Sequence, residues 1–193
     1  MLNLKSHRSL GFAMLALTMA STRFAGHLGT AWSPPDASWA VFFIAGFYLP
    51  REWRWALPAL IFEAVAIDIA SIRFCGVSNF CVTAAYWFNA PAYAALWIGG
   101  AWLRSGYEGQ PRDLGRLAVS MSISVSVSFL LTQGSFYWLG GRIPQPSLGG
   151  WWSNFTAWYG YFMAVSSGYV AVVAVVHAAV TRHAPAVVRA RIH

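Results

Sequence analysis

The sequence predicts an all-α fold: a polytopic membrane protein whose single domain, residues 1–193, is a six-transmembrane-helix bundle with cytoplasmic N- and C-termini. Hydrophobic residues make up 58% of the chain and charged residues only 10%, whereas soluble domains carry about 25% charge. Apolar segments close to the ~20 residues that span a bilayer recur along the chain. Basic residues gather at alternate ends of these segments, as expected of membrane loops.

The predicted spans follow one another with short inner connections. They cover residues 10–28, 38–49, 55–72, 82–102, 114–132 and 155–180. The second is short because Pro50 closes it, so we expect it to begin nearer Trp32 or to be tilted or partial. The first follows Lys5 and Arg8, which resemble the charged region of a signal peptide. No Ala-x-Ala site follows, and Arg23 lies where cleavage would fall, so an uncleaved helix is expected.

The distribution of basic residues predicts the orientation. With a cytoplasmic N-terminus, the outer segments hold only Arg23, Arg73 and Arg142. The inner segments hold the other ten basic residues: Lys5, Arg8, Arg51, Arg54, Arg104, Arg112, Arg116, Arg182, Arg189 and Arg191. Cytoplasmic loops are the basic ones, so six spans fit better than five or seven. These short clusters do not form the continuous basic face that nucleic acid requires, despite a net charge of +7.

Two acids lie inside the third predicted span. Glu63 is near its middle and Asp68 is close to its outer end. Intramembrane acids are costly and usually functional, so Asp68 is a candidate to meet water or a ligand at the outer mouth. The alternatives are that Asp68 pairs with Arg73 and that Glu63 only holds helices together by hydrogen bonds.

Small residues form stripes on two predicted helices. Ser120, Ser124 and Ser128 share one face of the fifth span, and Ala16 and Ala20 are four residues apart in the first. Such stripes permit close helix packing. Packing within the chain is the expected role, and docking onto another membrane protein is the alternative.

The predicted outer segments 29–37, 73–81 and 133–154 are longer than the inner ones, which suggests that a ligand enters from outside. Cys75 and Cys81 both lie there. They are interpreted as a disulfide, which an oxidising exterior permits, as plain small residues, or as a soft metal ligand or nucleophile. His27 is the histidine on the outer side.

Aromatic residues crowd the outer side of the last two spans. The chain has 11 Trp, and most Trp and Tyr at such positions belong to interfacial belts. Trp151 and Trp152 remain candidates to stack on a large planar ligand. Arg142, in the same segment, is a candidate contact for a phosphate or amide oxygen.

Two stretches carry a resemblance to a known family. They read Glu63-Ala-Val-Ala-Ile-Asp-Ile-Ala and Phe74-Cys-Gly-Val-Ser-Asn-Phe-Cys-Val-Thr-Ala-Ala-Tyr86. With the six short spans and outer loops, the chain resembles the BtuM family of small cobalamin (vitamin B12) transporters, which are related to the S-components of energy-coupling-factor transporters. The resemblance extends over essentially the whole chain and is most specific between Asp68 and Tyr86.

The resemblance implies a multi-pass protein of the bacterial inner membrane that binds cobalamin from the periplasm and mediates its uptake. It places a cysteine on the cobalt, a role that falls to Cys81, and makes Asp68 and Tyr86 ligand contacts. Cobalamin is then the bound substrate, with no other cofactor. The partners implied are the lipid bilayer and an energy-coupling module, although BtuM proteins often occur without that module.

The chemistry agrees with the resemblance. A thiolate is a strong soft donor for cobalt, and it would weaken the opposite axial ligand, so cyanide release from cyanocobalamin at Cys81 is a hypothesis. The chain has no Gly-x-x-x-x-Gly-Lys-Ser/Thr motif and does not hydrolyse ATP by that route. Two other classes stay open: a small membrane thiol oxidoreductase using Cys75 and Cys81, whose spacing departs from Cys-x-x-Cys, and an assembly protein using the serine stripe.

Overall fold

The computed structural model describes residues 4–28 and 33–183, and every regular element in those ranges is helical. The elements are α1 (Leu4–Leu28), α2 (Ser38–Tyr48), α3 (Trp53–Phe74), the 3₁₀ helix η1 (Ala84–Phe88), α4 (Asn89–Ser105), α5 (Arg112–Phe129), the π-helical turn η2 (Leu130–Gly134), α6 (Ser135–Leu139) and α7 (Leu148–His183). The predicted all-α class is therefore confirmed.

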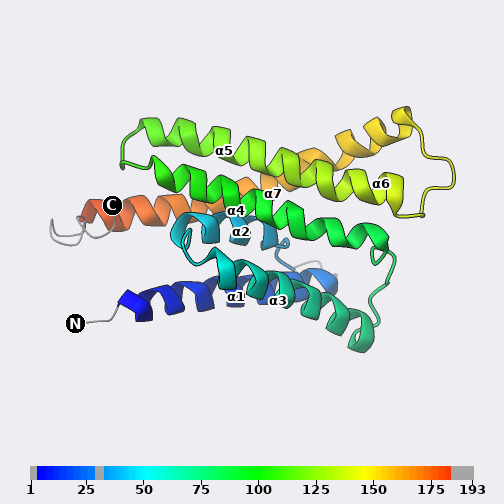
Figure 1. Ribbon diagram of the computed structural model, residues 1–193, viewed down its shortest axis with the longest axis horizontal. Helices are drawn as coiled ribbons and strands as arrows, with labels where there is room; N and C mark the ends of the chain where they lie inside the picture. The colour runs from blue at the N-terminus through cyan, green and yellow to red at the C-terminus, as the bar shows by residue number, and fades with distance from the viewer. Residues whose placement is uncertain (1–3, 29–32, 184–193) are drawn as a thin grey trace.

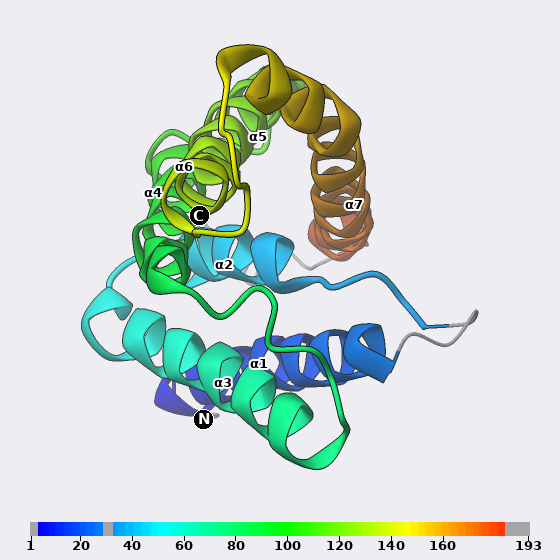
Figure 2. The ribbon, with the colours of Figure 1, turned by 90° about the vertical axis from the view of Figure 1, so that its right-hand side faces the viewer.

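The helical rods run alternately from one end of the molecule to the other (Figure 1). One end holds the start of α1, the α2–α3 and α4–α5 connections and the end of α7, and is called here the terminal end. The other end holds the α1–α2, α3–η1 and α6–α7 connections and is called the loop end. In the end-on view, α1 and α3 lie together on one side of α2, and α4 and α5 lie on the other (Figure 2).

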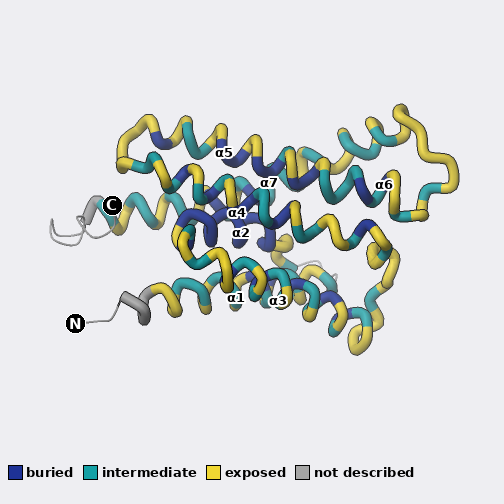
Figure 3. The backbone as a smooth tube through the Cα atoms, in the orientation of Figure 1, coloured by how far each residue is buried: buried dark blue, intermediate teal, exposed yellow. Residues whose placement is uncertain are grey.

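The core is centred on α2. All residues from Ser38 to Phe47 are buried, as the dark segment at the middle of the tube shows (Figure 3). Its 11 residues rise only ~16 Å, about half the thickness of a bilayer core. The expected short second span is thus a helix enclosed by protein, and it needs no lipid-facing length of its own.

The α2–α4 contact depends on glycine. A Cβ on Gly100 would lie 1.9 Å from the Phe43 carbonyl oxygen, and a Cβ on Gly46 would lie 2.1 Å from the Trp97 carbonyl oxygen. These neighbours are backbone atoms, which cannot rotate away. The two helices therefore approach as closely as they do because these positions lack side chains.

The serine stripe faces α4. The Ser120 hydroxyl donates to the Gly99 carbonyl at 2.7 Å, and the Ser128 hydroxyl donates to the Ala92 carbonyl at 2.7 Å. Ser120, Ser124 and Ser128 are all buried. The expectation of packing within the chain is confirmed, and the alternative of a docking face on this stripe is wrong because α4 covers it.

Several boundaries differ from the predicted ones. The fourth segment begins at Ala84 as a 3₁₀ turn and becomes α-helical only at Asn89. The fifth continues through η2 and α6 to Leu139, and α7 begins at Leu148. The outer segment predicted as 133–154 is therefore largely helical. The hydropathy pattern missed this extension because aromatic interfacial residues continue a helix as well as aliphatic ones do, and the chain turns only at Gly140 and Gly141, where φ of Gly141 is +66°.

Three helices in the described ranges are long and apolar enough to cross a membrane: Trp53–Phe74, Arg112–Leu139 and Leu148–Thr181. Their outward faces carry large apolar side chains, such as Phe62 and Val175, which are 75% and 69% exposed. Exposing such an apolar surface is unfavourable in water but not in lipid. These features indicate a membrane protein.

Candidate functional site

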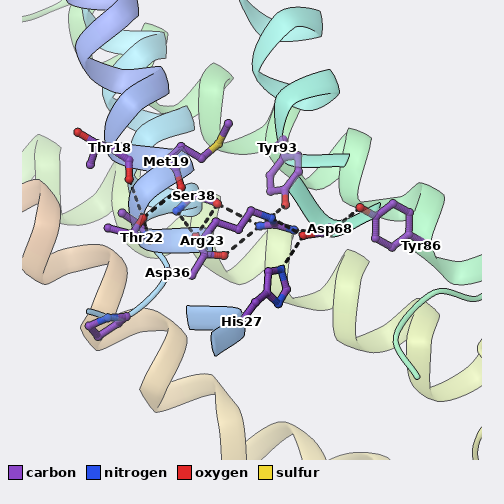
Figure 4. Close-up of polar contacts among 12 residues, drawn as sticks. Thr18, Met19, Thr22, Arg23, His27, Asp36, Ser38, Asp68, Tyr86 and Tyr93 are labelled. Atoms are coloured by element: carbon purple, nitrogen blue, oxygen red, sulfur yellow. Dashed lines mark hydrogen bonds and ion pairs between the residues drawn. The ribbon is translucent and has the colours of Figure 1, made fainter. Parts of the chain in front are cut away.

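The candidate site is a polar cluster near the loop end whose centre is an ion pair between α1 and α3 (Figure 4). Arg23 Nε lies 2.7 Å from Asp68 Oδ1, and Arg23 Nη2 lies 2.7 Å from Asp68 Oδ2. This two-pronged arrangement is the strongest geometry an arginine and a carboxylate can adopt. The side chains are only 11% and 9% exposed, so each charge depends on the other.

The remaining Arg23 nitrogen ties the pair to α2 and α4. Nη1 donates to Asp36 Oδ2 at 2.9 Å, to the Ser38 hydroxyl at 3.0 Å and to the Tyr93 hydroxyl at 3.4 Å. Arg23 thereby joins two carboxylates from different segments. The guanidinium is the hub of the cluster.

Asp68 has two further partners. The Tyr86 hydroxyl donates to Oδ2 at 2.7 Å, and His27 Nε2 lies 2.9 Å from Oδ1. With the two bonds from Arg23, each carboxylate oxygen has two partners. Asp68 therefore has no vacant acceptor position in this structure, and it holds α1, α3 and η1 together.

Local structure places these side chains. Asp68 lies on the buried stripe of α3 that also includes Ala64 and Ser71. The Asp36 carboxylate accepts the Ser38 backbone N–H at 2.9 Å at the start of α2. The Thr83 hydroxyl accepts the Ala85 N–H at 3.2 Å, a cap that starts η1 and sets the direction of Tyr86.

The alternative that Asp68 pairs with Arg73 is wrong. Residues five apart lie about 140° apart around a helix, so Asp68 and Arg73 face different directions. Asp68 faces α1, where Arg23 binds it, and Arg73 lies at the exposed end of α3. The hub Arg23 was missed as a site residue. A usable signal was present, since Arg23, although counted with the outer segments, lies near the outer end of the predicted span 10–28, and charges inside spans pair with one another.

The cysteines lie in the segment between α3 and η1. Cys75 and Cys81 are both free thiols and both exposed, so the disulfide interpretation does not describe this structure. The segment turns at Gly76, whose φ is +67°. It ends with the Val82 N–H donating to the Asn79 carbonyl at 2.9 Å, which holds Cys81 in a turn.

Arg142 meets this cysteine segment. Its Nε donates to the Phe80 carbonyl at 3.1 Å, and its guanidinium lies 5.2 Å from the centre of the Phe80 ring. Phe80 also contacts Phe136 with ring centres 5.7 Å apart. The α6–α7 connection is thus anchored beside Cys81.

Trp151 and Trp152 do not join the Arg23–Asp68 cluster. Both contact Phe155 in α7, with ring centres 5.7 and 5.6 Å apart. Trp152 is 59% exposed. Among the predicted site residues, the structure joins Asp68 directly to Tyr86 and places Arg142 next to the Cys81 segment, while the two tryptophans form a separate aromatic group.

A cavity of about 410 Å³ opens beside the cluster. Its lining comes from α1, the α1–α2 connection and α7: Arg23, Gly26, His27, Ser33, Pro34, Pro35, Asp36 and Tyr161. It exposes His27 and Asp36, whose side chains are 29% and 40% accessible. Polar ligand groups can therefore reach the cluster from its Asp36 side.

Within residues 4–28 and 33–183, no three His, Cys, Asp or Glu side chains are placed to hold a metal ion together. A single thiolate can bind a metal ion that arrives already held by another ligand. The exposed Cys81 thiol has that capacity once it is deprotonated.

No protein-family model matches the chain, and no curated protein matches it in sequence.

Proposed function

We propose that the chain crosses the bacterial inner membrane six times with both termini in the cytoplasm. The up-and-down arrangement of its rods, its three long apolar helices and the ten inner basic residues support this topology. The terminal end then faces the cytoplasm. The loop end, with the Arg23–Asp68 cluster and both cysteines, faces the periplasm.

In this orientation the protein binds cobalamin from the periplasm and mediates its uptake. The observation that carries the proposal is Cys81, an exposed free thiol five residues before Tyr86, whose hydroxyl is bonded to the buried Asp68. A ligand bound at Cys81 therefore contacts a segment that is hydrogen-bonded, through Tyr86, to the interhelical ion pair. The family resemblance suggests cobalamin as this ligand.

The proposed bond joins the Cys81 thiolate to Co(III). It forms when the thiol loses its proton to solvent and the nitrogen base of cobalamin, which occupies that axial position, leaves cobalt with its electron pair. With cyanocobalamin, cyanide leaves the opposite axial position with its electron pair, and water takes that position. Cobalt stays at +3, so the step needs no reductant. A soft thiolate suits cobalt and weakens the bond opposite it.

The other residues have supporting roles in this proposal. Trp151 and Trp152 stack on the planar corrin ring, and Arg142 donates to a phosphate or amide oxygen of the ligand. Asp68 and Tyr86 contact the ligand after one of the hydrogen bonds to Asp68 opens, because Asp68 has no vacant acceptor position beforehand.

An energy-coupling module is the partner that the resemblance suggests for transport. Ala16, one of the two small residues considered for docking, packs against the buried core. This packing favours a role for Ala16 inside the molecule, so we propose that uptake proceeds without a module docked on that stripe.

The first prediction concerns cobalt ligation. Purified protein mixed with aquocobalamin should shift the visible absorption bands of cobalt, because a thiolate replaces an oxygen or nitrogen ligand. Cys81→Ser should remove the shift. Cys75→Ser, which alters the other free thiol of the same segment, should keep it. A shift that persists in Cys81→Ser would defeat the proposal.

A thiol oxidoreductase is the second candidate function. It is favoured by one observation, the two free exposed thiols within a single segment. They would reduce a partner disulfide by thiol–disulfide exchange, forming a Cys75–Cys81 bond while the partner gains two thiols. A reversible loss of both thiols, with no cobalt spectrum, would select this function instead.

A further inference from the structure

A second cavity, also about 410 Å³, lies at the opposite, terminal end. It is a groove between α2, the α4–α5 connection, α5 and α7. It shares no lining residue with the cavity at the Arg23–Asp68 cluster. Nothing in the proposed cobalamin function uses it.

The lining changes character with depth. Gln110, Asp113 and Thr181 line the terminal end of the groove, Tyr107 and His177 also line it, and farther along α5 and α7 are Leu117 and Val170. From Thr181 to Val170 the helix rises ~16 Å. A groove with polar groups at its terminal end and mainly apolar side chains farther along has the layout of a headgroup followed by part of an acyl chain.

Asp113 is the charged group of this groove and is only 5% exposed. Its Oδ2 accepts the N–H groups of Glu108 at 3.0 Å and Gln110 at 2.9 Å. Its Oδ1 is buried and has no hydrogen-bond partner in the described part of the chain. A carboxylate oxygen without a geometric donor in the protein can accept a hydrogen bond from a ligand that enters the groove.

Aromatic rings line the same groove as Asp113. Phe47 and Tyr107 meet edge to face with centres 5.3 Å apart, and His177 lies 5.4 Å from Tyr107. Ring faces attract ammonium groups, most of all where water is excluded. Arg104, which lies 5.5 Å from the Phe47 ring, adds a positive charge suited to a neighbouring phosphate.

We infer that this groove binds a phospholipid with an ammonium headgroup. The ammonium donates to Asp113 Oδ1 beside the rings, the phosphate lies toward Arg104, and one acyl chain lies along Leu117 and Val170. The inference rests on the proposed membrane insertion and is independent of cobalamin binding.

The test is native mass spectrometry of the delipidated, purified protein titrated with phosphatidylethanolamine and phosphatidylglycerol that carry identical acyl chains. Wild-type protein should bind phosphatidylethanolamine at least about tenfold more tightly, the ratio expected for one charge-assisted hydrogen bond. Asp113→Asn should reduce the preference to about twofold or less. The asparagine oxygen still accepts the two N–H bonds, so the loop should keep its shape.

Two further variants control the result. Glu108→Gln removes an acid of the same loop whose side chain is 57% exposed, and it should keep the preference. Ala174→Trp fills the aliphatic part of the groove and should weaken both lipids. Cobalamin absorption, recorded on the same samples, should not change with any variant, which separates this test from that of the proposed function.

Equal binding of the two lipids by wild-type protein would overturn the inference. So would an undiminished preference in Asp113→Asn, or tight binding of free ethanolamine without a preference between the lipids. Undiminished lipid binding by Ala174→Trp would place the lipid outside the groove and overturn it as well.

Discussion

Arg23 illustrates how much a single buried charge can organise. It contacts Asp68, Asp36, Ser38 and Tyr93, residues that belong to three different segments of the chain. Removing one partner from a buried pair leaves the other charge without compensation, which usually costs more than the pair itself contributes. The cluster is therefore sensitive to single substitutions and more tolerant of paired ones.

The second prediction follows at this scale. Arg23→Met should lower the free energy of unfolding by about 3 kcal/mol, because it strands a carboxylate that is 9% exposed. The double variant Arg23→Met/Asp68→Leu should be more stable than the sum of the single effects by at least ~1 kcal/mol. Unfolding by denaturing detergent, followed by tryptophan fluorescence, measures the cycle.

Arg73→Met is the matched control, since it removes the exposed arginine of α3. It should change the free energy of unfolding by less than ~0.5 kcal/mol. Additive effects of the Arg23 and Asp68 substitutions would contradict the coupling that the two short contacts indicate.

At the scale of elements, the seam between α2 and α4 decides how the core is built. Gly46 and Gly100 allow backbone to approach backbone there. The serine stripe plays the same part between α4 and α5, with hydroxyls that bond to α4 carbonyls. Small residues set the helix spacing at both seams.

The third prediction tests the α2–α4 seam. Gly100→Ala should destabilise the protein by about 1–3 kcal/mol, because a Cβ 1.9 Å from the Phe43 oxygen forces the helices apart. Gly168→Ala is the control in α7, where a Cβ meets nothing within 4 Å. Alanine is the better helix former, so this control should be neutral or stabilising by up to ~1 kcal/mol. Similar losses in both variants would argue against the seam.

At the scale of the whole molecule, the two ends differ in chemistry. The loop end has exposed thiols and the Arg23–Asp68 cluster, and the terminal end has the groove with Asp113. The proposed topology assigns these ends to opposite sides of one membrane.

The fourth prediction is the labelling pattern that this topology requires. On spheroplasts, a membrane-impermeant maleimide should label Cys75 and Cys81 from outside. In a Cys75→Ser/Cys81→Ser background, Ser105→Cys, at the exposed end of α4, should label only after permeabilisation. The reverse pattern would indicate the opposite orientation. Labelling of both positions from outside would contradict the proposed six-span topology.

Much of the fold could be predicted before the structure. The helical class and the approximate positions of all six rods follow from apolar runs, and α2 was expected to be short because of Pro50. Local signals failed at the extension to Leu139, where aromatic residues and a π-helical turn continue a helix that hydropathy ends at Thr132.

The candidate site was only half predictable. Asp68 and Tyr86 were singled out as ligand contacts, and they proved to be hydrogen-bonded to each other. Arg23, His27 and Asp36 were not expected in the same cluster. Local sequence patterns do not reveal contacts between distant residues, and Arg23 and Asp68 are 45 residues apart.

By itself, the sequence determined that this protein is helical and suited to a membrane, because apolar length and charge placement are properties of each segment alone. The tertiary structure decided the partner of Asp68, the inward direction of the serine stripe and the groove around Asp113. Each of these depends on which face of one helix meets another, and packing sets that only when the whole chain has folded.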